Sequence, residues 1–573
     1  MPVANAEIAE LFERYAALLE IDGANAFRVR AYRNAARTIE NLPQSAAGMV
    51  DEGADLSELP GIGEDLAGKV QAIVESGSFR ELDELESEVP EGLAALSDLP
   101  GLGPKRTAHL HRELGVDDLD GLRAAAEAGK VRALDGFGEK TEAKILDAIA
   151  RRAGQETRFR LATAEQLAEP LLAHLRAVDG VEQAEIAGSY RRRKETVGDL
   201  DIVVVAGTGS PVMDRFAGYD AVEEVVSKGE TRSTVRLRNG LQVDLRVMEQ
   251  AAYGAALHYF TGSKAHNIRT RRIAGEEGCK LNEYGLFRDD QRIAGTDEVE
   301  VYAALRLEWM PPELREDRGE IEAARSGTLP ELVTLDAIRG DLHCHTTWSD
   351  GRDSLRAMAD AAKARGYAYL AVTDHSRHSR IANGLDPERL AEQLDAIDRL
   401  ADELDGFRLL KGSEVDILED GALDLPDDIL RRLDLRVCSL HHRLDLPRSQ
   451  QTERVLRAMD NRLFNILAHP TGRLIDKRAP AELDLERVLE GARERGCHLE
   501  INAQPERLDL DDTHARMAKE IGVKLAISSD AHATAGLATL RFGIDQARRA
   551  WLGPDDVLNT RPWSELEKLL ERS

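Results

Sequence analysis

Five short clusters of histidine, aspartate and glutamate follow one another along the C-terminal part of the chain. They occupy residues 341–345, 373–375, 412–414, 440–442 together with 468–470, and 529–532. Each lies near a short apolar run, such as residues 369–372, that is typical of a buried strand. Side chains alternate along a strand, so His343 and His345 are expected to point the same way. A lone histidine is more often a core or surface residue, but five clusters in order predict a metal site at the open end of a barrel.

A second set of acidic residues lies in the middle of the chain. Asp199 and Asp201 adjoin a β-branched run, and Gly188 and Ser189 precede them by a short interval. Asp244 lies in a later alternating run, on the polar face, with the apolar residues at 241, 243 and 245 expected to pack inward. Carboxylates that share a patch repel one another unless cations are bound between them. The pattern predicts a two-metal site for phosphoryl transfer, with Mg²⁺ as the natural ion.

The N-terminal third is helical by pattern and contains a repeat. A Gly-x-Gly turn followed by helix-forming sequence occurs three times, at Gly61 and Gly63, at Gly101 and Gly103, and at Gly136 and Gly138. Glycine permits a tight turn and lets a phosphate approach the N–H groups at a helix start. Such turns also join ordinary helices, but three copies resemble helix-hairpin-helix elements and predict binding to a nucleic-acid backbone, with Lys105 among the contacts.

The bulk composition sets broader limits. A chain of 573 residues is too long for one core, so several domains are expected. Four widely spaced cysteines, with no Cys-x-x-Cys, indicate a reducing compartment, and no segment is typical of a signal peptide or a membrane span. The formal charge of −28 argues against bulk attraction to nucleic acid. The basic runs at 191–194 and 269–272 are either local DNA tracks or solvated charged faces.

On these motifs, residues 1–318 resemble a family X DNA polymerase and the remainder resembles a PHP (polymerase and histidinol phosphatase) domain. The resemblance implies that Asp199, Asp201 and Asp244 are the catalytic, metal-binding carboxylates of the palm, holding two Mg²⁺ or Mn²⁺ ions. Asp244 would lie by the primer 3′-hydroxyl and assist its deprotonation. Residues that would hold the triphosphate are Gly188, Ser189, Arg192 and Gly198. Val197 departs from the family pattern, which often has a serine there.

A further motif, after the palm, extends the resemblance from nucleotidyltransferases in general to polymerases. The segment 259–263 matches the family's border of the nucleotide sugar, where Tyr259, Phe260 and Gly262 would help to exclude a ribose 2′-hydroxyl. Lys264 replaces an acidic residue of vertebrate relatives and would favour nucleotide binding. Asn267 and Arg271 match positions that contact the nucleotide or the template.

The resemblance also includes the lyase domain of DNA polymerase beta. Lys69 matches the Schiff-base lysine of that domain. A lysine nucleophile must be partly neutral, but Asp65 would hold the ammonium charged, and Arg28 and Asp65 stand where relatives have lysine. Lys69 is therefore either a lyase nucleophile or only a phosphate contact.

Nine residues of the C-terminal part fall on the metal-ligand positions of the PHP family. They are His343, His345, Asp350, His375, Glu414, His441, His469, Asp530 and His532. His441 fits the motif better than His442, and both stay open as ligands. Mixed imidazole and carboxylate ligands suit Zn²⁺ or Mn²⁺, and the resemblance implies three ions. Bound cations lower the pKa of water, as hydrolysis of phosphate esters requires.

The motifs and the resemblance together predict a multidomain α/β protein. Its parts are a lyase-like helical domain with a helix-hairpin-helix (1–85), helix-hairpin-helix fingers (86–150), a nucleotidyltransferase palm with a mixed sheet and helices (151–250), an α/β thumb (251–318), a linker (319–338) and a distorted (β/α)7-type PHP barrel (339–573). The composition of the linker indicates a hinge or an extended tether.

We therefore expect a DNA-directed DNA polymerase of family X that fills short gaps in base excision repair. It would use dNTPs and gapped or primer-template DNA, as a cytoplasmic monomer without a membrane partner. The PHP domain would add 3′–5′ exonuclease, 3′-end processing and abasic-site endonuclease activity. Two alternatives stay open, namely a phosphoesterase whose polymerase half only docks DNA, and a non-catalytic scaffold that recruits repair partners. Primer extension would distinguish them.

Overall fold

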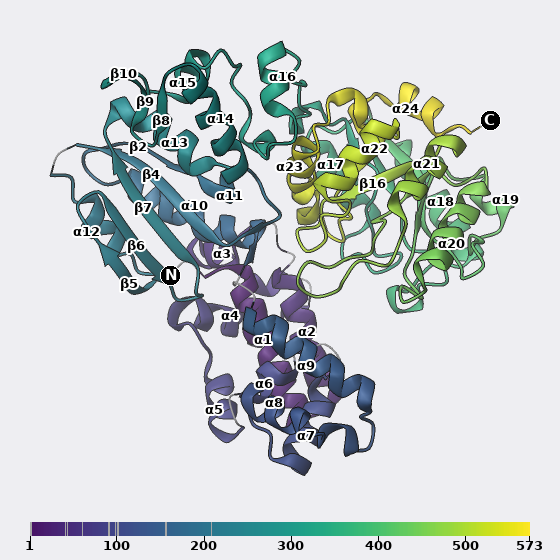
Figure 1. The fold of residues 1–573 in the computed structure, drawn as a ribbon. Coiled ribbons are helices and arrows are strands. Elements are labelled where there is room, and N and C mark those ends of the chain that lie inside the picture. The colour runs from purple at the N-terminus through teal and green to yellow at the C-terminus, as the bar shows by residue number, and fades with distance from the viewer. Residues whose placement is uncertain are drawn as a thin grey trace. The chain divides into compact units, whose positions relative to one another are not determined.

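The computed structural model describes residues 3–572 with the exception of positions 41, 43, 60, 90, 91, 98, 100, 101, 155–157 and 208. The chain packs as two units (Figure 1). One unit contains Met1–Phe159, Thr163–Asp179 and Pro211–Asp244, and the other contains Arg160–Ala162, Gly180–Ser210 and Leu245–Ser573. None of the described helices is both long and apolar enough to cross a membrane.

The N-terminal end folds into two small helical cores. The first contains α1 (Asn5–Ile21), α2 (Ala26–Glu40), α3 (Ala46–Asp51), α4 (Glu64–Ser76) and α5 (Arg80–Glu88). Its centre is aromatic: the ring of Tyr15 lies edge-on to Tyr32 and Phe79, with centroids 4.7 and 5.1 Å apart. The second core contains α6 (Gly92–Ser97), α7 (Pro104–Leu114), α8 (Leu119–Glu127) and α9 (Glu139–Gly154).

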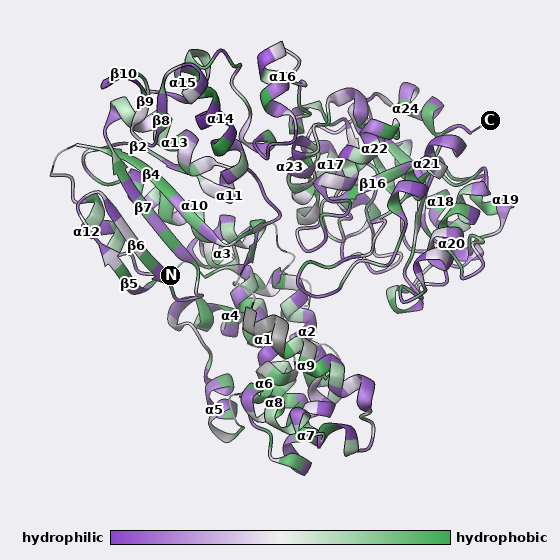
Figure 2. Ribbon diagram, in the orientation of Figure 1, coloured by the Kyte–Doolittle hydropathy of each residue, from purple (hydrophilic) through white to green (hydrophobic). Residues whose placement is uncertain are grey.

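A five-stranded sheet follows, in the strand order β2-β4-β7-β6-β5. The strands are β2 (Val181–Ile186), β4 (Asp199–Ala206), β5 (Val222–Lys228), β6 (Arg232–Leu237) and β7 (Gln242–Met248). Strands β1 (Phe159–Arg160) and β3 (Thr196–Val197) pair separately, and the helices are α10 (Leu161–Arg176), α11 (Gly188–Arg191) and α12 (Val212–Ala217). β4 is β-branched and apolar after its first residues (Figure 2), which explains its burial between neighbours on both sides.

The next part has its own apolar core. Its elements are α13 (Tyr253–Thr261), α14 (Lys264–Glu276), β8 (Lys280–Asn282), β9 (Gly285–Arg288), β10 (Gln291–Ala294), α15 (Glu298–Ala304) and α16 (Glu320–Ser326). The linker predicted at 319–338 contains α16, which buries Ile321 and Ala324 against this core, so its first part is helical and not extended. The buried carboxylate of Glu320 also holds α16 against α14, with Oε1 2.7 Å from His266 Nδ1.

A parallel sheet in sequential order β11-β12-β13-β14-β15-β16-β17 forms the C-terminal domain. The strands are β11 (Gly340–Asp341), β12 (Tyr369–Val372), β13 (Arg408–Asp416), β14 (Leu435–Ser439), β15 (Ile466–Leu467), β16 (His498–Asn502) and β17 (Leu525–Ser528). A parallel bridge between Cys344 and Ala531 joins the two edges and nearly closes the sheet into a barrel. The fold-class prediction is thereby confirmed, with one strand for each expected β/α unit.

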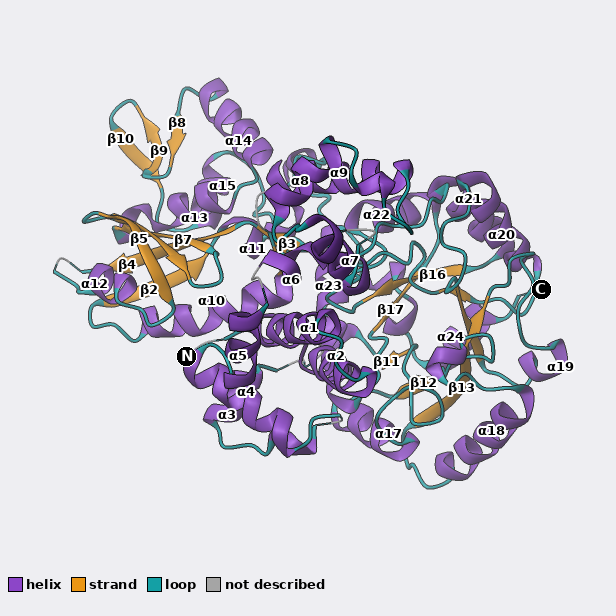
Figure 3. Cartoon of the chain, turned by 90° about the horizontal axis from the view of Figure 1, so that it is seen from below, coloured by secondary structure: helices purple, strands orange, loops and turns teal. Residues whose placement is uncertain are grey.

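Helices surround this barrel in the connections between strands (Figure 3). They are α17 (Leu355–Ala364), α18 (Pro387–Ala401), α19 (Asp427–Leu430), α20 (Arg448–Asp460), α21 (Leu485–Arg495), α22 (Asp512–Ile521), α23 (Leu540–Arg549) and the C-terminal α24 (Trp563–Leu570). Alternation along the strands separates two apolar layers: Leu370 packs with the outer helices, whereas Tyr369 packs inside with Leu566 and Leu570 of α24. α24 therefore fills one end of the barrel and leaves the other for polar groups.

Candidate active sites

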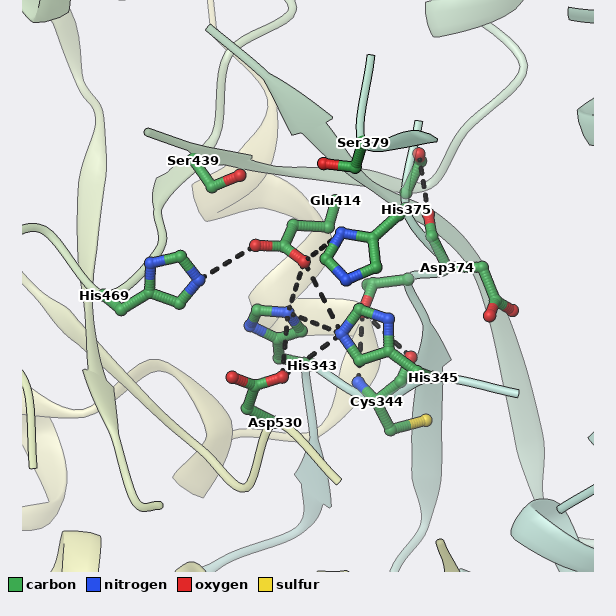
Figure 4. A network of polar contacts seen from close by, with 12 residues as sticks. His343, Cys344, His345, Asp374, His375, Ser379, Glu414, Ser439, His469 and Asp530 are labelled. Carbon is green, nitrogen blue, oxygen red and sulfur yellow. Dashed lines mark hydrogen bonds and ion pairs between the residues drawn. The ribbon is translucent and has the colours of Figure 1, made fainter. Parts of the chain in front are cut away.

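Glu414 on β13 lies at the centre of a cluster of imidazoles in the barrel (Figure 4). Its Oε1 is 2.9 Å from His469 Nε2 and 3.1 Å from His441 Nε2. Its Oε2 is 2.9 Å from His375 Nδ1. The Nε2 atoms of His343 and His345 are both 3.5 Å from the same oxygen. One buried carboxylate thus faces five imidazole rings, an arrangement suited to bridging cations.

The ligand atoms gather into three overlapping groups, each compact enough to hold one ion. The groups are His345, Asp350, His375 and His532; His343, His345 and Asp530; and His375, Glu414 and His441. With His469, which contacts Glu414, the structure brings together all nine residues that the sequence singled out. Shared members such as His345 and His375 place the groups side by side, as a multinuclear site requires.

Each member of the cluster stands at the same end of the barrel. His375 follows β12, His441 follows β14, and His469 follows β15. The strand expected to carry His343 and His345 is shorter than predicted, since β11 ends at Asp341. The two rings nevertheless point the same way, with their Nε2 atoms 3.2 Å apart. The peptide N–H of His345 donates to the carbonyl of Ala531 at 2.8 Å, which holds this segment in place without a regular strand.

The choice between His441 and His442 has a geometric answer. His441 lies in the cluster, with its Nδ1 3.0 Å from Asp416 Oδ1. His442 is exposed, and its ring stands perpendicular to that of His378, with centroids 4.6 Å apart. The arrangement therefore favours His441 as the ligand.

The electrostatics of the cluster fit bound cations. Burial would lower the pKa of His343, but Glu500, Asp530 and Glu414 raise it well above its usual range. Burial would likewise raise the pKa of Glu414, but His375, His441 and His343 lower it well below its usual range. The carboxylates thus stabilise positive charge among the imidazoles. A bound divalent ion can supply that positive charge in place of protons on the imidazoles. A buried Nδ1 of His345 lacks a hydrogen-bond partner among the described residues, as expected of a ligand atom.

Sequence reasoning missed the residues that orient this cluster. Glu500, in β16, accepts from His343 Nδ1 at 2.7 Å and from the peptide N–H of His469 at 2.7 Å. Asp416 supports His441, as described above, and lies two residues after Glu414 on the same strand face. Carboxylates of this kind fix the tautomer and raise the basicity of a ligating imidazole. A charged residue between the apolar Leu499 and Ile501 was the available signal for Glu500.

Asp374 holds the segment that carries Asp350. It is buried and accepts from Thr346 Oγ1 at 2.6 Å and from Ser349 Oγ at 2.5 Å. These bonds tie the residues before Asp350 to the end of β12. Asp350 consequently reaches the cluster, with Oδ2 3.6 Å from His375 Nε2 and 3.4 Å from His532 Nε2.

The second predicted site lies in the five-stranded sheet. Asp199 and Asp201 are the first and third residues of β4, and Asp244 is in β7, the neighbour of β4 in the sheet. Gly188 has φ +63°, and a Cβ there would stand 3.1 Å from Asp201 Oδ2. Both facts favour glycine at this turn. They also show that the turn at Gly188 lies directly against Asp201 of β4.

Asp244 differs from its predicted surroundings. The sequence indicated a polar face of the strand, but Asp244 is 6% exposed. Its Oδ1 accepts from Thr234 Oγ1 at 2.6 Å, and its Oδ2 accepts from Gln242 Nε2 at 3.1 Å. Hydrogen bonds from β6 and from its own strand therefore fix the orientation of this carboxylate.

The basic run at 191–194 is tied into ion pairs. Arg191 forms a two-pronged pair with Glu298 at 2.9 and 2.8 Å, and Arg193 NH2 pairs with Asp545 at 2.7 Å. Arg192, expected to hold the triphosphate, donates from Nε to Glu316 Oε1 at 3.0 Å. The three arginines of this run are therefore neither a solvated charged face nor an unpaired basic surface for DNA.

Arg549 of α23 extends the Arg192 contact into the barrel domain. It is 2% exposed, and its NH1 donates to the carbonyl of Arg192 at 2.7 Å and to Glu316 Oε1 at 3.1 Å. Its NH2 donates to Asp512 Oδ2 at 2.6 Å. The guanidinium of Arg549 therefore stabilises both the backbone of Arg192, the candidate triphosphate ligand, and the carboxylate of Glu316, its ion-pair partner.

The segment after α13 also has a defined geometry. The rings of Tyr259 and Phe260 lie edge-on, with centroids 5.1 Å apart, and Arg246 lies 4.3 Å from the centroid of Phe260. Asn267 Nδ2 donates to the carbonyl of Tyr259 at 2.6 Å. Gly262 stands where a Cβ would be 3.2 Å from Arg192 NH1, whereas Lys264 and Arg271 are exposed.

The helical turns match the predicted hairpins where they are described. Gly61, Gly103 and Gly136 have φ values of +76°, +79° and +78°, which favour glycine. Gly63 and Gly103 are the N-cap residues of α4 and α7, and Gly138 lies just before α9. Lys105 lies in the first turn of α7, where a phosphate would meet free N–H groups. Gly101 lies outside the described residues.

The candidate lyase residue is held in an acidic pair. Lys69 is 6% exposed, and its Nζ lies 2.5 Å from Asp65 Oδ1 and 3.2 Å from Glu81 Oε1. Burial would lower the pKa of Lys69, but the two carboxylates raise it above its usual value. The sequence identified Asp65 but missed Glu81, which comes from the next helix. An amine held protonated by two carboxylates is a poor nucleophile.

We expect no Schiff base between Lys69 and an abasic site. Borohydride trapping with 5′-deoxyribose-phosphate DNA should yield no covalent adduct with the wild-type protein. The double variant Asp65→Asn/Glu81→Gln should give an adduct, because burial then lowers the pKa of the amine without opposition. Glu64→Gln, which changes an exposed carboxylate on the same helix, is the matched control. A wild-type adduct lost in Lys69→Arg would contradict this expectation.

Comparison with family models assigns each part of the chain. Two helix-hairpin-helix models, "Helix-hairpin-helix domain" and "SAM-like Helix-hairpin-helix tandem", match residues 3–79 and 93–151. The DNA polymerase beta palm matches 161–266 and the DNA polymerase beta thumb matches 256–316. The PHP domain matches 341–504. These ranges are consistent with the predicted order of parts, although the exact boundaries stay predictions.

Similar proteins of known name fall into three groups. The chain is 40% identical over 571 residues to DNA polymerase/3′-5′ exonuclease PolX of Bacillus subtilis (strain 168), covering 99% of each. It is 28% identical over 301 residues to DNA polymerase lambda of Rattus norvegicus, covering 49% of each. It is 30% identical over 243 residues to a probable phosphatase of Thermoanaerobacter sp. (strain X514), covering 40% of this chain and 94% of the relative.

These similarities differ in how much of the chain they cover. The polymerase relative from rat covers about half of it and the phosphatase relative a smaller part, whereas the Bacillus protein covers nearly all of it. The palm, the thumb and the barrel are all present in one sequence order. The chain belongs to the family X DNA polymerases that carry a C-terminal PHP domain.

Proposed function

We propose that this chain is a DNA polymerase with 3′–5′ exonuclease activity, which fills short gaps during DNA repair. The observation that carries the proposal is the full-length similarity to a DNA polymerase/3′-5′ exonuclease. The metal-ligand groups of the barrel support the exonuclease part. The helix-hairpin-helix parts support DNA as the substrate.

The palm carboxylates are proposed to hold two Mg²⁺ or Mn²⁺ ions. When bound, such ions neutralise the charge that develops on the attacking and leaving oxygens of a phosphoryl displacement. The chain's own contribution is orientation: Gly188 allows Asp201 to lie against the turn, and Thr234 fixes Asp244. Asp244 would accept the proton of a primer 3′-hydroxyl. Arg192 would meet the triphosphate in competition with Glu316.

The barrel is proposed to remove nucleotides or blocking groups from 3′ ends and to cut at abasic sites. Its imidazole and carboxylate ligands suit Zn²⁺ or Mn²⁺, and three ions fit the three ligand groups. When bound, these ions would lower the pKa of the attacking water and polarise the phosphate. Glu500 and Asp416 hold His343 and His441 in the required orientation.

Gap filling predicts a preference that can be measured. We expect kcat/KM for nucleotide addition to be at least about tenfold higher on a one-nucleotide gap with a 5′-phosphate than on an open template, because the hairpin turns grip backbone phosphates. Lys105→Gln should reduce that preference without changing extension on the open template, and Lys130→Gln, an exposed lysine outside the turns, should not. Equal efficiency on both substrates would contradict the gap-filling role but not polymerase activity itself.

A further inference from the structure

The loop between β12 and α18 stands at the mouth of the metal-ligand cluster. It leaves the site directly after His375 and returns at Leu385, whose peptide N–H donates to the carbonyl of His375 at 2.7 Å. The N–H of Ser376 donates to the carbonyl of Glu414 at 2.9 Å. Both ends of the loop at residues 377–384 are therefore fixed to backbone that carries candidate ligands.

The loop is braced along its length. The Oγ of Ser379 donates to Asp416 Oδ2 at 2.7 Å, and the N–H of His378 donates to Asp424 Oδ2 at 2.9 Å. At Gly384 a Cβ would stand 2.0 Å from the carbonyl oxygen of Ser376, so no side chain fits there. Arg389 NH1 donates to the carbonyl of Asn383 at 2.9 Å. The apex of the loop is consequently presented in a defined position.

The outer face of this loop carries an apolar side chain between two cationic ones. Ile381 at its apex is fully exposed, at 103% of its reference area. Arg377 and Arg380 beside it are exposed, and in the part of the chain that the structure describes their guanidiniums form no hydrogen bond or ion pair. Burial of an isoleucine is favourable, so Ile381 would add to the free energy of binding if a ligand packed against it.

Some other exposed arginines of the barrel domain are paired with carboxylates. Arg432 donates to Asp395 at 3.3 Å, and Arg443 donates to Glu419 at 2.8 Å. On a chain with a formal charge of −28, the exposed guanidiniums of Arg377 and Arg380 provide a local attraction for anions, and Arg377 also interacts electrostatically with Asp424. The exposed, perpendicular rings of His378 and His442 lie next to them and offer flat surfaces for a base.

This combination matches the requirements of single-stranded nucleic acid. Such strands are held by cationic side chains on the phosphates together with ring or apolar surfaces against the bases. We propose that the 377–384 loop, with His442, binds the unpaired 3′-terminal nucleotides of a DNA strand and leads them to the cluster. Arg377 and Arg380 contact two phosphates, and Ile381 packs against the terminal base and separates it from its partner. The inference rests on the exonuclease function proposed above.

The test uses the full-length protein with Mn²⁺ and three substrates. They are a single-stranded oligonucleotide, a primer-template with a paired 3′ end, and the p-nitrophenyl ester of thymidine 5′-phosphate, which has no preceding nucleotides. The variants are Arg377→Gln/Arg380→Gln, Ile381→Ser and Ile381→Val. The charge-matched control is Arg431→Gln/Arg432→Gln, which removes two paired arginines from the same domain.

We expect Arg377→Gln/Arg380→Gln to raise KM for the single strand about tenfold. The slope of log KM against log salt should fall by about 1.4, since each phosphate contact on a single strand contributes about 0.7. Ile381→Ser should lower kcat/KM about tenfold on the paired end and less than twofold on the single strand, and Ile381→Val should retain most activity on both. Ester hydrolysis should stay within twofold in every variant.

Several outcomes would overturn the proposal. One is an unchanged KM and salt slope in the arginine variant, and another is an equal loss on paired and single-stranded ends in Ile381→Ser. A parallel loss of ester hydrolysis would show that the loop acts on the cluster rather than on DNA. A wild-type protein that hydrolyses the ester but no DNA 3′ end would instead overturn the exonuclease function, and with it this role of the loop.

Discussion

Asp201→Asn is expected to lower the rate of nucleotide addition on gapped DNA by about 10³-fold or more, which corresponds to about 4 kcal/mol of transition-state stabilisation. The side chain keeps its size, but the loss of one negative charge weakens the hold on cations between β4 and its neighbours. Single-turnover extension with one dNTP measures the chemical step directly.

The same variant should retain 3′–5′ exonuclease activity, because the barrel contributes its own ligand groups. Asp214→Asn, which changes an exposed carboxylate on α12, is the matched control and should extend primers normally. If Asp201→Asn extended a primer at the wild-type rate, the assignment of the palm site would fail. Loss of both activities together would point to misfolding, which thermal unfolding of the variant would reveal.

Glu414→Gln should reduce 3′–5′ exonuclease activity by about 10³-fold while primer extension continues. This carboxylate faces five imidazoles, and an amide can neither bridge cations nor balance their charge. Bound metal should also fall, and elemental analysis of purified wild-type and variant protein measures it. The metal content gives a readout that is independent of activity.

Two further substitutions grade this effect. Glu500→Gln acts through His343 and should cost about 10–100-fold in activity or metal affinity, as expected for the partner of a ligand. Glu419→Gln changes an exposed carboxylate paired with Arg443 and should leave the nuclease intact. A Glu414→Gln protein with full activity and full metal content would contradict the barrel site.

The metal-ligand cluster could be predicted from the sequence because its residues follow successive strands. In a parallel barrel the carboxyl ends of the strands lie at one face, so residues far apart in sequence, such as His375 and His469, come together there. Their proximity can therefore be predicted without knowing any specific tertiary contact. Glu500 was missed because its strand carries no recognisable motif. Asp416 could have been found, since alternation places it on the same face as Glu414.

Charge pairing across long sequence separations could not be predicted. The run at 191–194 reads as a basic surface, and only the fold brings Glu298, Glu316 and Asp545 to its arginines. The same limit applies to Lys69: Asp65 is one helical turn away and could be anticipated, but Glu81 reaches it from the following helix. The sequence indicates which groups are charged, whereas the tertiary fold decides which charges cancel.

Arg549 has a consequence for how the two enzymatic activities are dissected. Truncating the chain before the barrel would delete the donor that satisfies both the carbonyl of Arg192 and the carboxylate of Glu316. In the resulting fragment the carbonyl of Arg192 would lose this donor, and Glu316 would keep only Arg192 and Lys194 as ion-pair partners. Poor nucleotide addition by such a fragment would then reflect the loss of the contacts that Arg549 makes, and not a need for exonuclease activity.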